Sequence, residues 1–114
     1  MQINISARHG HLSTQTQALI TEKVEKVKRL HDRLTSIVVT CDLEHKEVPI
    51  VEVRVVAEHA GEFVATDKNE NLIVALDSAI HKVEQQLRKY KEKLTEHRAA
   101  GHRELAGELE QESE

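Results

Sequence analysis

The sequence is poor in the residues that build disulfides, aromatic surfaces and glycine-rich loops. Its 114 residues include one cysteine, one proline, four glycines and no tryptophan, and Phe63 and Tyr90 are the only aromatic residues. The single Cys41 cannot form an internal disulfide. Two rings are too few for a platform on which several bases of a single strand stack. The core must therefore be built from aliphatic side chains.

Long apolar runs are also missing. No stretch of about 18 apolar residues occurs, so the sequence predicts no membrane span. The opening residues, MQINIS, do not form a basic segment followed by an apolar one, as a secretory leader would. We therefore expect a cytoplasmic protein that has no membrane partner. The length favours one domain with a single modest core.

No arrangement of residues is typical of a catalytic or metal centre. The glycines form no phosphate-binding loop, and no Ser-His-Asp or Cys-His set follows from the spacing. His9 and His11 have strand-like spacing, but no second pair with ligand spacing follows. Cys41 lies in the β-branched run SIVVTCDL, which favours a buried strand thiol over a nucleophile. We expect no enzymatic activity, no cofactor and no metal site.

The strongest positive signal is an amphipathic segment from Asn71 to Leu94. Its apolar residues recur at intervals of three and four, which is typical of a helix with one buried face. They are Leu72, Leu76, Ile80, Val83, Leu87, Tyr90 and Leu94. Asn71 is a suitable N-terminal cap. Residues 78–95 carry five basic and two acidic side chains, although the whole chain has a net charge of −4.

An earlier helix is predicted from Thr14 to about Asp32. Ser13 and Thr14 offer side-chain oxygens as caps, and Thr14 with Gln17 has capping-box spacing. The residues expected to face the core are Ile20, Val24, Val27 and either Leu30 or His31. Lys23, Lys26 and Arg33 are expected along one flank of that arc.

Four further segments read as strands because apolar and polar residues alternate or β-branched residues gather in them. They are Gln2–Ala7, Ser36–Glu44, Ile50–Glu58 and Glu62–Thr66. The element order is therefore β-α-β-β-β-α. This order predicts an α+β fold: a four-stranded sheet in which the last three strands form an antiparallel meander and both helices pack on one face.

Charge is distributed unevenly along the chain. The two helical segments sum to +5, whereas residues 42–70 sum to −5, with eight acidic and three basic side chains. If both helices cover one face, the helix side is basic and the open face of the sheet is acidic. We therefore expect an anionic partner on the helix side.

The character of the sequence changes after Thr95. Residues 96–114 hold six acidic and two basic side chains and no sustained apolar stripe. They are predicted to form an acidic C-terminal tail, into which the long helix can continue some way past Arg98, with the last ten or so residues flexible. The tail either solubilises the protein or repels or competes with a polyanion.

Several of these features together resemble the bacterial hibernation-promoting factors and protein Y, a family of ribosome-associated inhibitors. They are MQINIS, the spacing of Lys23 and Lys26, the element order, and above all ALDSAIHKVEQQLRKYKEKL. The resemblance covers residues 1–95 and implies a ribosome-binding domain with a fold similar to the double-stranded-RNA-binding domain. It also implies binding to the small ribosomal subunit and its ribosomal RNA, where messenger and transfer RNA would sit.

The family's basic positions carry over to particular residues. Lys23 and Lys26 match the first helix. The second helix supplies Lys82, Lys89, Lys91 and Lys93, with Arg88 a compatible addition. Lower-ranked candidates for RNA contact are Lys28, Arg29, Arg33 and Gln86. Two departures occur: Asn71-Leu72-Ile73 replaces the usual Asp-Met-Tyr, and Gln85 stands where arginine is common.

Flexible lysines contact phosphates with little base specificity, so the affinity for RNA should fall steeply as salt rises.

The resemblance implies that the protein inhibits idle ribosomes by steric occlusion in stationary phase or stress. Two subtypes stay open: a short factor that acts with ribosome modulation factor to promote ribosome dimers, and a protein Y-like inhibitor, which the acidic tail slightly favours. The alternative is a non-ribosomal protein-interaction module that uses the acidic sheet face or the tail. We expect no DNA partner.

Overall fold

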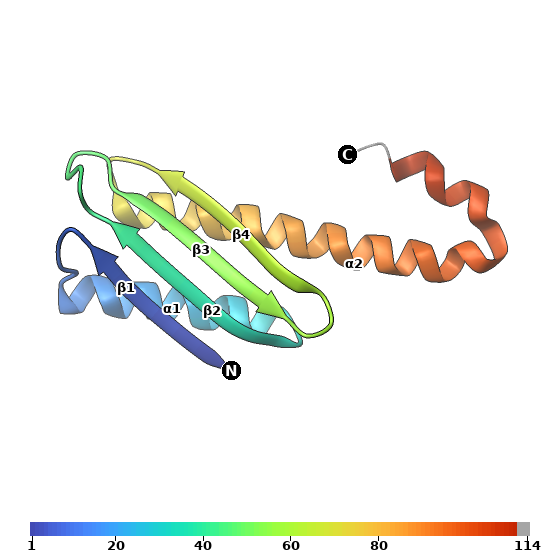
Figure 1. Ribbon diagram of the computed structural model, residues 1–114, viewed down its shortest axis with the longest axis horizontal. Helices are drawn as coiled ribbons and strands as arrows, with labels where there is room; N and C mark the ends of the chain where they lie inside the picture. The colour runs from blue at the N-terminus through green and yellow to red at the C-terminus, as the bar shows by residue number, and fades with distance from the viewer. Residues whose placement is uncertain (112–114) are drawn as a thin grey trace. The chain divides into compact units, whose positions relative to one another are not determined.

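The computed structural model describes the backbone of residues 1–111 and the side chains of residues 1–94. It divides into two compact units, Met1–Glu84 and Gln85–Glu114. The elements are β1 (Gln2–Arg8), α1 (Thr14–Leu30), β2 (Leu34–Asp42), β3 (Ile50–Ala57), β4 (Gly61–Lys68) and α2 (Leu72–Gln111) (Figure 1). The predicted order β-α-β-β-β-α is confirmed. The helix α2 begins in the first unit and continues into the second.

The sheet has the strand order β1-β2-β3-β4. β1 and β2 are parallel because α1 connects them as a crossover, whereas β2, β3 and β4 form the predicted antiparallel meander. One row of the sheet shows the register: Ile5 lies beside Val39, Val39 opposite Val53, and Val53 opposite Ala65. Because side chains alternate between faces, this register gathers the apolar residues on one face.

Both helices cover that apolar face within the unit Met1–Glu84 (Figure 1). The helices bury Ile20, Val24 and Val27 from α1 and Ala75, Leu76, Ala79 and Val83 from α2. Burying one such aliphatic side chain contributes about 1.5–3 kcal/mol. Cys41 is fully buried in this layer, and burial raises the pKa of its thiol to about 11. The predicted strand-core thiol is confirmed.

The ends of α1 refine the sequence prediction. The Ser13 Oγ accepts a hydrogen bond from the backbone N–H of Thr16 at 3.1 Å, so Ser13 is the cap. The helix ends at Leu30, two residues before the predicted end. Leu30 is 61% exposed and His31 is only 8% exposed. His31 therefore occupies the core position that the sequence left open between these two residues.

The start of α2 is as predicted, and its end lies further along the chain. The Asn71 Oδ1 accepts hydrogen bonds from the backbone N–H groups of Ile73 and Val74, at 2.9 and 3.3 Å. The helix continues past Leu94 to Gln111. Residues 112–114 lie outside the described residues, so the flexibility of the last part of the chain stays a prediction.

The prediction of an acidic open face is wrong. Register places three acidic and three basic side chains on the uncovered face: Arg8, Asp42, Glu52, Arg54, Glu62 and Lys68. The other acidic residues of the segment lie in loops, apart from Asp67, which faces the helix side and pairs with Lys82. Composition gave the charge of the segment but not the face to which each residue belongs. An acidic sheet face therefore cannot recruit a basic partner.

Candidate nucleic-acid interface

The helix side of the unit Met1–Glu84 carries three of the predicted RNA contacts. The Nζ of Lys23, on α1, lies 3.0 Å from the Oδ1 of Asp77, on α2. The Nζ of Lys82, on α2, lies 3.2 Å from the Oδ2 of Asp67. Lys26 is exposed and has no ion-pair partner in the described part of the chain. Two of the three lysines are thus already paired with a carboxylate.

Asp67 is held firmly in its ionised form. A hydrogen bond from the Ser78 hydroxyl is the largest cause that lowers the pKa of this carboxyl, followed by the backbone N–H of Lys68 and the ammonium of Lys82. The carboxylate joins the end of β4 to the first turns of α2. It therefore positions Lys82 at the surface and also neutralises part of its charge.

The lower-ranked candidates for RNA contact in this unit do not share one location, because two lie on α1 and one lies in the turn that follows it. Lys28 lies 3.9 Å from Glu25, one helical turn earlier, and Arg29 is exposed. Arg33 is not on the flank of α1, as the spacing predicted, because the helix ends at Leu30. It occupies the turn before β2 with a φ of 65°, in the left-handed region. Arg33 therefore lies apart from the helical row.

The second unit begins with a strongly basic stretch of α2. Residues 85–94 include four basic side chains and one acidic side chain. Arg88, Lys89, Lys91 and Lys93 are all exposed, and Gln86 is half-buried. Helical spacing places Lys89 and Lys93 on one row and Arg88 and Lys91 on another. This stretch therefore presents cations along more than one side of the helix.

A groove of about 270 Å³ lies between α1 and the part of α2 in the unit Met1–Glu84. Its lining consists of Lys23, Lys26, Val27 and Leu30 from α1 and Asp77, Ile80, His81 and Glu84 from α2. Beside it, the Nε2 of His31 lies 3.2 Å from the Oε2 of Glu84, and His31 is the only buried polar residue among the described side chains. Sequence reasoning missed this pair, since its members are 53 positions apart.

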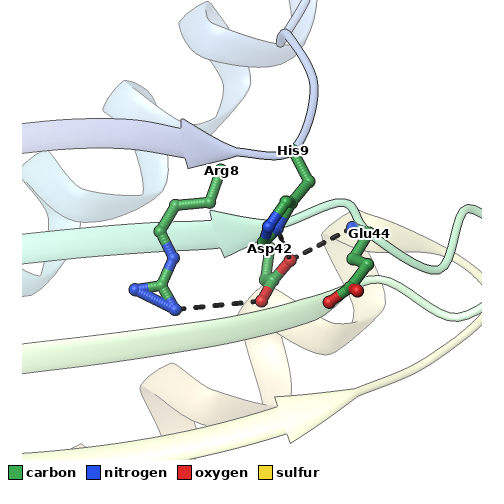
Figure 2. Close-up of polar contacts among 4 residues, drawn as sticks. All are labelled: Arg8, His9, Asp42 and Glu44. Atoms are coloured by element: carbon green, nitrogen blue, oxygen red, sulfur yellow. Dashed lines mark hydrogen bonds and ion pairs between the residues drawn. The ribbon is translucent and has the colours of Figure 1, made fainter.

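A second cluster of polar side chains joins the ends of β1 and β2 (Figure 2). The Nδ1 of His9 lies 2.9 Å from the Oδ1 of Asp42, which also accepts the backbone N–H of Glu44 at 3.1 Å. These bonds, led by the one to His9, lower the pKa of the Asp42 carboxyl. The Arg8 guanidinium lies 3.9 Å from the other oxygen.

This cluster differs from the histidine pair considered in the sequence. His9, Asp42 and Glu44 each offer one atom able to bind a metal, and these atoms lie within 4.8 Å of one another. The structure thus brings His9 together with carboxylates from a distant segment, which spacing alone does not reveal. Hydrogen bonds and the nearby Arg8 account for the arrangement as a link between two strand ends.

The sequence model of one protein family, described as "Sigma 54 modulation protein / S30EA ribosomal protein", matches residues 3–95. The chain belongs to this family. One similar relative is the ribosome hibernation promoting factor of Azotobacter vinelandii, 36% identical over 99 residues, covering 84% of this chain and 88% of the relative. Another, from Escherichia coli strain K12, is 27% identical over 97 residues, covering 85% and 100%.

Two solved structures have the same fold as this chain. A ribosomal subunit interface protein from Coxiella burnetii matches with a TM-score of 0.71 and 23% identity, covering 80% of this chain and 98% of the other. The N-terminal domain of Thermus thermophilus protein Y matches with a TM-score of 0.66 and 20% identity, covering 79% and 99%. At these identities the likeness shows the fold alone.

The family match includes every predicted RNA-contact residue, from Lys23 to Lys93, but assigns a role to none of them. The roles of these residues in this S30EA family member therefore stay predictions. No helix in the described residues is long and apolar enough to cross a membrane.

Proposed function

We propose that this protein is a ribosome hibernation factor that binds the small ribosomal subunit through basic side chains of α1 and α2. Family membership and relatives named ribosome hibernation promoting factor support this function. The observation that carries the mode of binding is the excess of exposed cations on the helices. α1 carries four basic and two acidic side chains, and residues 85–94 carry four basic and one acidic.

Ribosomal RNA is the proposed ligand, contacted mainly at its phosphates. Lys26 meets a phosphate without first losing a protein partner, whereas Lys23 and Lys82 exchange an aspartate for a phosphate. This exchange costs little, because an exposed ion pair contributes only about 0–1 kcal/mol. Each phosphate contact also releases counterions from the RNA, which favours binding at low salt.

The consequence of binding is occlusion. A domain seated in the channel of the small subunit excludes messenger and transfer RNA, so the ribosome is silenced and protected in stationary phase or stress. The protein then acts in the cytoplasm. Its acidic tail favours holding single ribosomes over promoting dimers with ribosome modulation factor.

Sedimentation through sucrose gradients tests this function. The purified protein is mixed with bacterial ribosomes at low and at moderate salt. We expect it to migrate with the small subunit and with single ribosomes, and to be released as salt rises. Adding ribosome modulation factor distinguishes the subtypes, because only the dimer-promoting type shifts ribosomes to dimers.

A triple variant tests the surface. Lys82→Glu, Lys89→Glu and Lys93→Glu together should abolish co-migration, while circular dichroism remains that of the parent. If the parent protein stays at the top of the gradient at low salt, it is not a ribosome-binding factor. If the triple variant co-migrates normally, the contact surface lies elsewhere.

A further inference from the structure

The groove between α1 and α2 has walls of opposite charge. The α1 wall supplies Lys23 and Lys26, and the α2 wall supplies Asp77 and Glu84. Apolar side chains lie between them: Val27 is buried, Ile80 is half-buried and Leu30 is exposed. The groove therefore combines cations, carboxylates and an apolar surface in about 270 Å³.

This combination does not suit a phosphate alone. The carboxylates of Asp77 and Glu84 repel a phosphate, so the lining as a whole is better matched by a ligand that offers hydrogen-bond donors as well as an anionic group. A nucleotide, in contrast, presents a charged phosphate, the apolar faces of a base and a hydrogen-bonding edge. The volume is close to the lower end of small-molecule sites, about 300–1,000 Å³, which fits one nucleotide and not a large cofactor.

Of the two acidic residues in the lining, Glu84 is the one whose carboxylate is held in place for hydrogen bonds to the edge of a base. Its Oε2 accepts a hydrogen bond from the Nε2 of His31, and the two side chains are 18% and 8% exposed. The other oxygen, Oε1, has no hydrogen-bond partner in the described part of the chain. Because His31 is buried, its hydrogen bond orients the carboxylate, while Oε1 and the second lone pair of Oε2 remain able to accept the two donors of a base edge.

We propose that this groove binds a single unstacked nucleotide of the RNA, with the base edge at Glu84 and the phosphate at Lys26. This inference rests on the proposed function, since it names the RNA element that the helix side receives. Sequence-specific recognition of RNA commonly targets bases that are turned out of a helix and hydrogen-bonded along an edge. The apolar floor of Val27, Ile80 and Leu30 takes the place of aromatic stacking for this one base.

The carboxylate also sets the base preference. An ionised carboxylate only accepts hydrogen bonds, and guanine offers it two adjacent donors, N1–H and the N2 amino group. Uracil offers a single N3–H between two carbonyl oxygens, which the carboxylate repels. The groove therefore selects guanine over uracil. A well-formed pair with a base discriminates by about 1–3 kcal/mol, which corresponds to about 5- to 150-fold in affinity.

Methyl NMR of the full chain tests the groove directly. Guanosine monophosphate, uridine monophosphate and inorganic phosphate are titrated separately at low salt. We expect the guanine nucleotide to shift the methyl signals of Val27, Leu30 and Ile80, with an affinity about 5- to 150-fold higher than that of the uracil nucleotide. Inorganic phosphate should leave these methyls unshifted. Equal affinities, or no methyl shift at millimolar guanine nucleotide, overturn the proposal.

The substitution Glu84→Gln separates base recognition from a structural tie. Glutamine keeps an oxygen that can accept the His31 N–H but turns the second position into an amide donor, which complements a carbonyl of uracil. The preference for guanine should therefore fall or reverse. Glu22→Gln, the same change of charge on the exposed surface of α1, should leave the ratio unchanged. An unaltered ratio in Glu84→Gln would show that Glu84 only joins the helices.

Ribosome sedimentation distinguishes this inference from the proposed function. A parent protein that binds ribosomes but shows equal nucleotide affinities contradicts the groove and leaves the function standing. A guanine preference without ribosome binding contradicts the function, and the groove then serves another RNA.

Discussion

In the unit Met1–Glu84, the open face of the sheet and the side covered by the helices both carry charged side chains, but these are arranged differently. On the open face, Arg54 lies between Glu62 and Glu52, at 2.6 and 3.1 Å, and the face as a whole has as many acidic as basic residues. On the helix side, α1 has four basic and two acidic residues, whereas residues 72–84 of α2 have one basic and two acidic. The excess of cations in this unit therefore lies on α1, where Lys26 and Arg29 lack an ion-pair partner among the described side chains. Opposite charges a few ångströms apart cancel beyond about one Debye length, roughly 8–10 Å. The excess of one sign, and not the number of charges, decides which side attracts a polyanion.

Secondary structure accounts for this difference. On the sheet, Arg54 lies directly opposite Val38 and Val64. Its acidic partners are Glu52, two residues earlier on β3, and Glu62, diagonally across on β4. A helix instead repeats its rows every three or four residues, so Lys23, Lys26 and Arg29 can align along one flank. Carboxylates from the neighbouring segment compensate only part of that row, as Asp77 does for Lys23.

The largest expected effect comes from reversing charge on one side at a time. Lys26→Glu with Arg29→Glu should weaken ribosome binding on the order of 100-fold, because placing like charges together costs several kcal/mol. The control, Lys46→Glu with Lys68→Glu, changes the net charge equally, away from the helix side, and should change affinity little. Sedimentation at fixed salt measures both. Equal losses would mean that binding follows net charge and that the distinction between the sides is irrelevant.

A smaller effect is expected from the same substitution on the two faces of one strand. Val39→Ala, in the core, should lower the free energy of unfolding by about 2–3 kcal/mol, since it removes buried apolar volume and leaves a cavity. Val38→Ala, on the open face, should cost less than about 1 kcal/mol. Urea denaturation of both variants gives the difference. Similar losses would indicate that the open face is covered in solution.

The sequence predicts these strands and helices because periodicity is local. Val38 and Val39 belong to a run of β-branched residues. The steps of three and four place Leu76, Val83 and Leu87 correctly on the buried face of α2, but Leu94, at the end of the predicted stripe, is 40% exposed. The choice between Leu30 and His31 could not be made, because a helix end shifts by one or two residues without changing the pattern. Local signals therefore determine the elements and most of the core.

The candidate site was predicted less completely because it depends on distant partners. Lys23 and Lys82 were identified as cations, but their pairing with Asp77 and Asp67 required the packing of three elements. The charge of the open face was wrong for the same reason, since register and not composition places Arg54 among its acidic neighbours. The sequence gives the chemical type of each side chain, but only the folded structure shows which charges lack a nearby partner of opposite sign.

The salt dependence of RNA binding compares one lysine on the helix side with one lysine away from it. Lys26→Ala should lower the slope of log affinity against log salt by about one, because it removes one phosphate contact. Lys46→Ala, in the loop between β2 and β3, should leave the slope unchanged. Binding of fluorescent ribosomal RNA fragments at several salt concentrations measures both slopes. An unchanged slope for Lys26→Ala would remove it from the contact surface.

The smallest expected effect concerns acid, at the end of the open face. The pKa of Asp42 is lowered in the folded protein, chiefly by the hydrogen bond from His9. A carboxyl with a depressed folded-state pKa stabilises the protein above its unfolded pKa of about 3.9, and this stabilisation is lost as pH falls through the folded-state value. The parent should therefore melt above Asp42→Asn at pH 6, and this difference should shrink steadily as the pH falls below about 4.

His9→Ala provides the control for this effect, because it removes the principal donor and leaves the carboxyl in place. In that background Asp42→Asn should change the melting temperature less, and the difference should depend less on pH. If the parent and Asp42→Asn instead keep a constant difference from pH 6 to 3, the Asp42 carboxylate is not the group that links the strand ends. In that case the charged groups that stabilise the open face would be Arg54 and its partners Glu52 and Glu62 at the centre of the sheet. The charges at the ends of β1 and β2 would then contribute nothing to the stability of the fold.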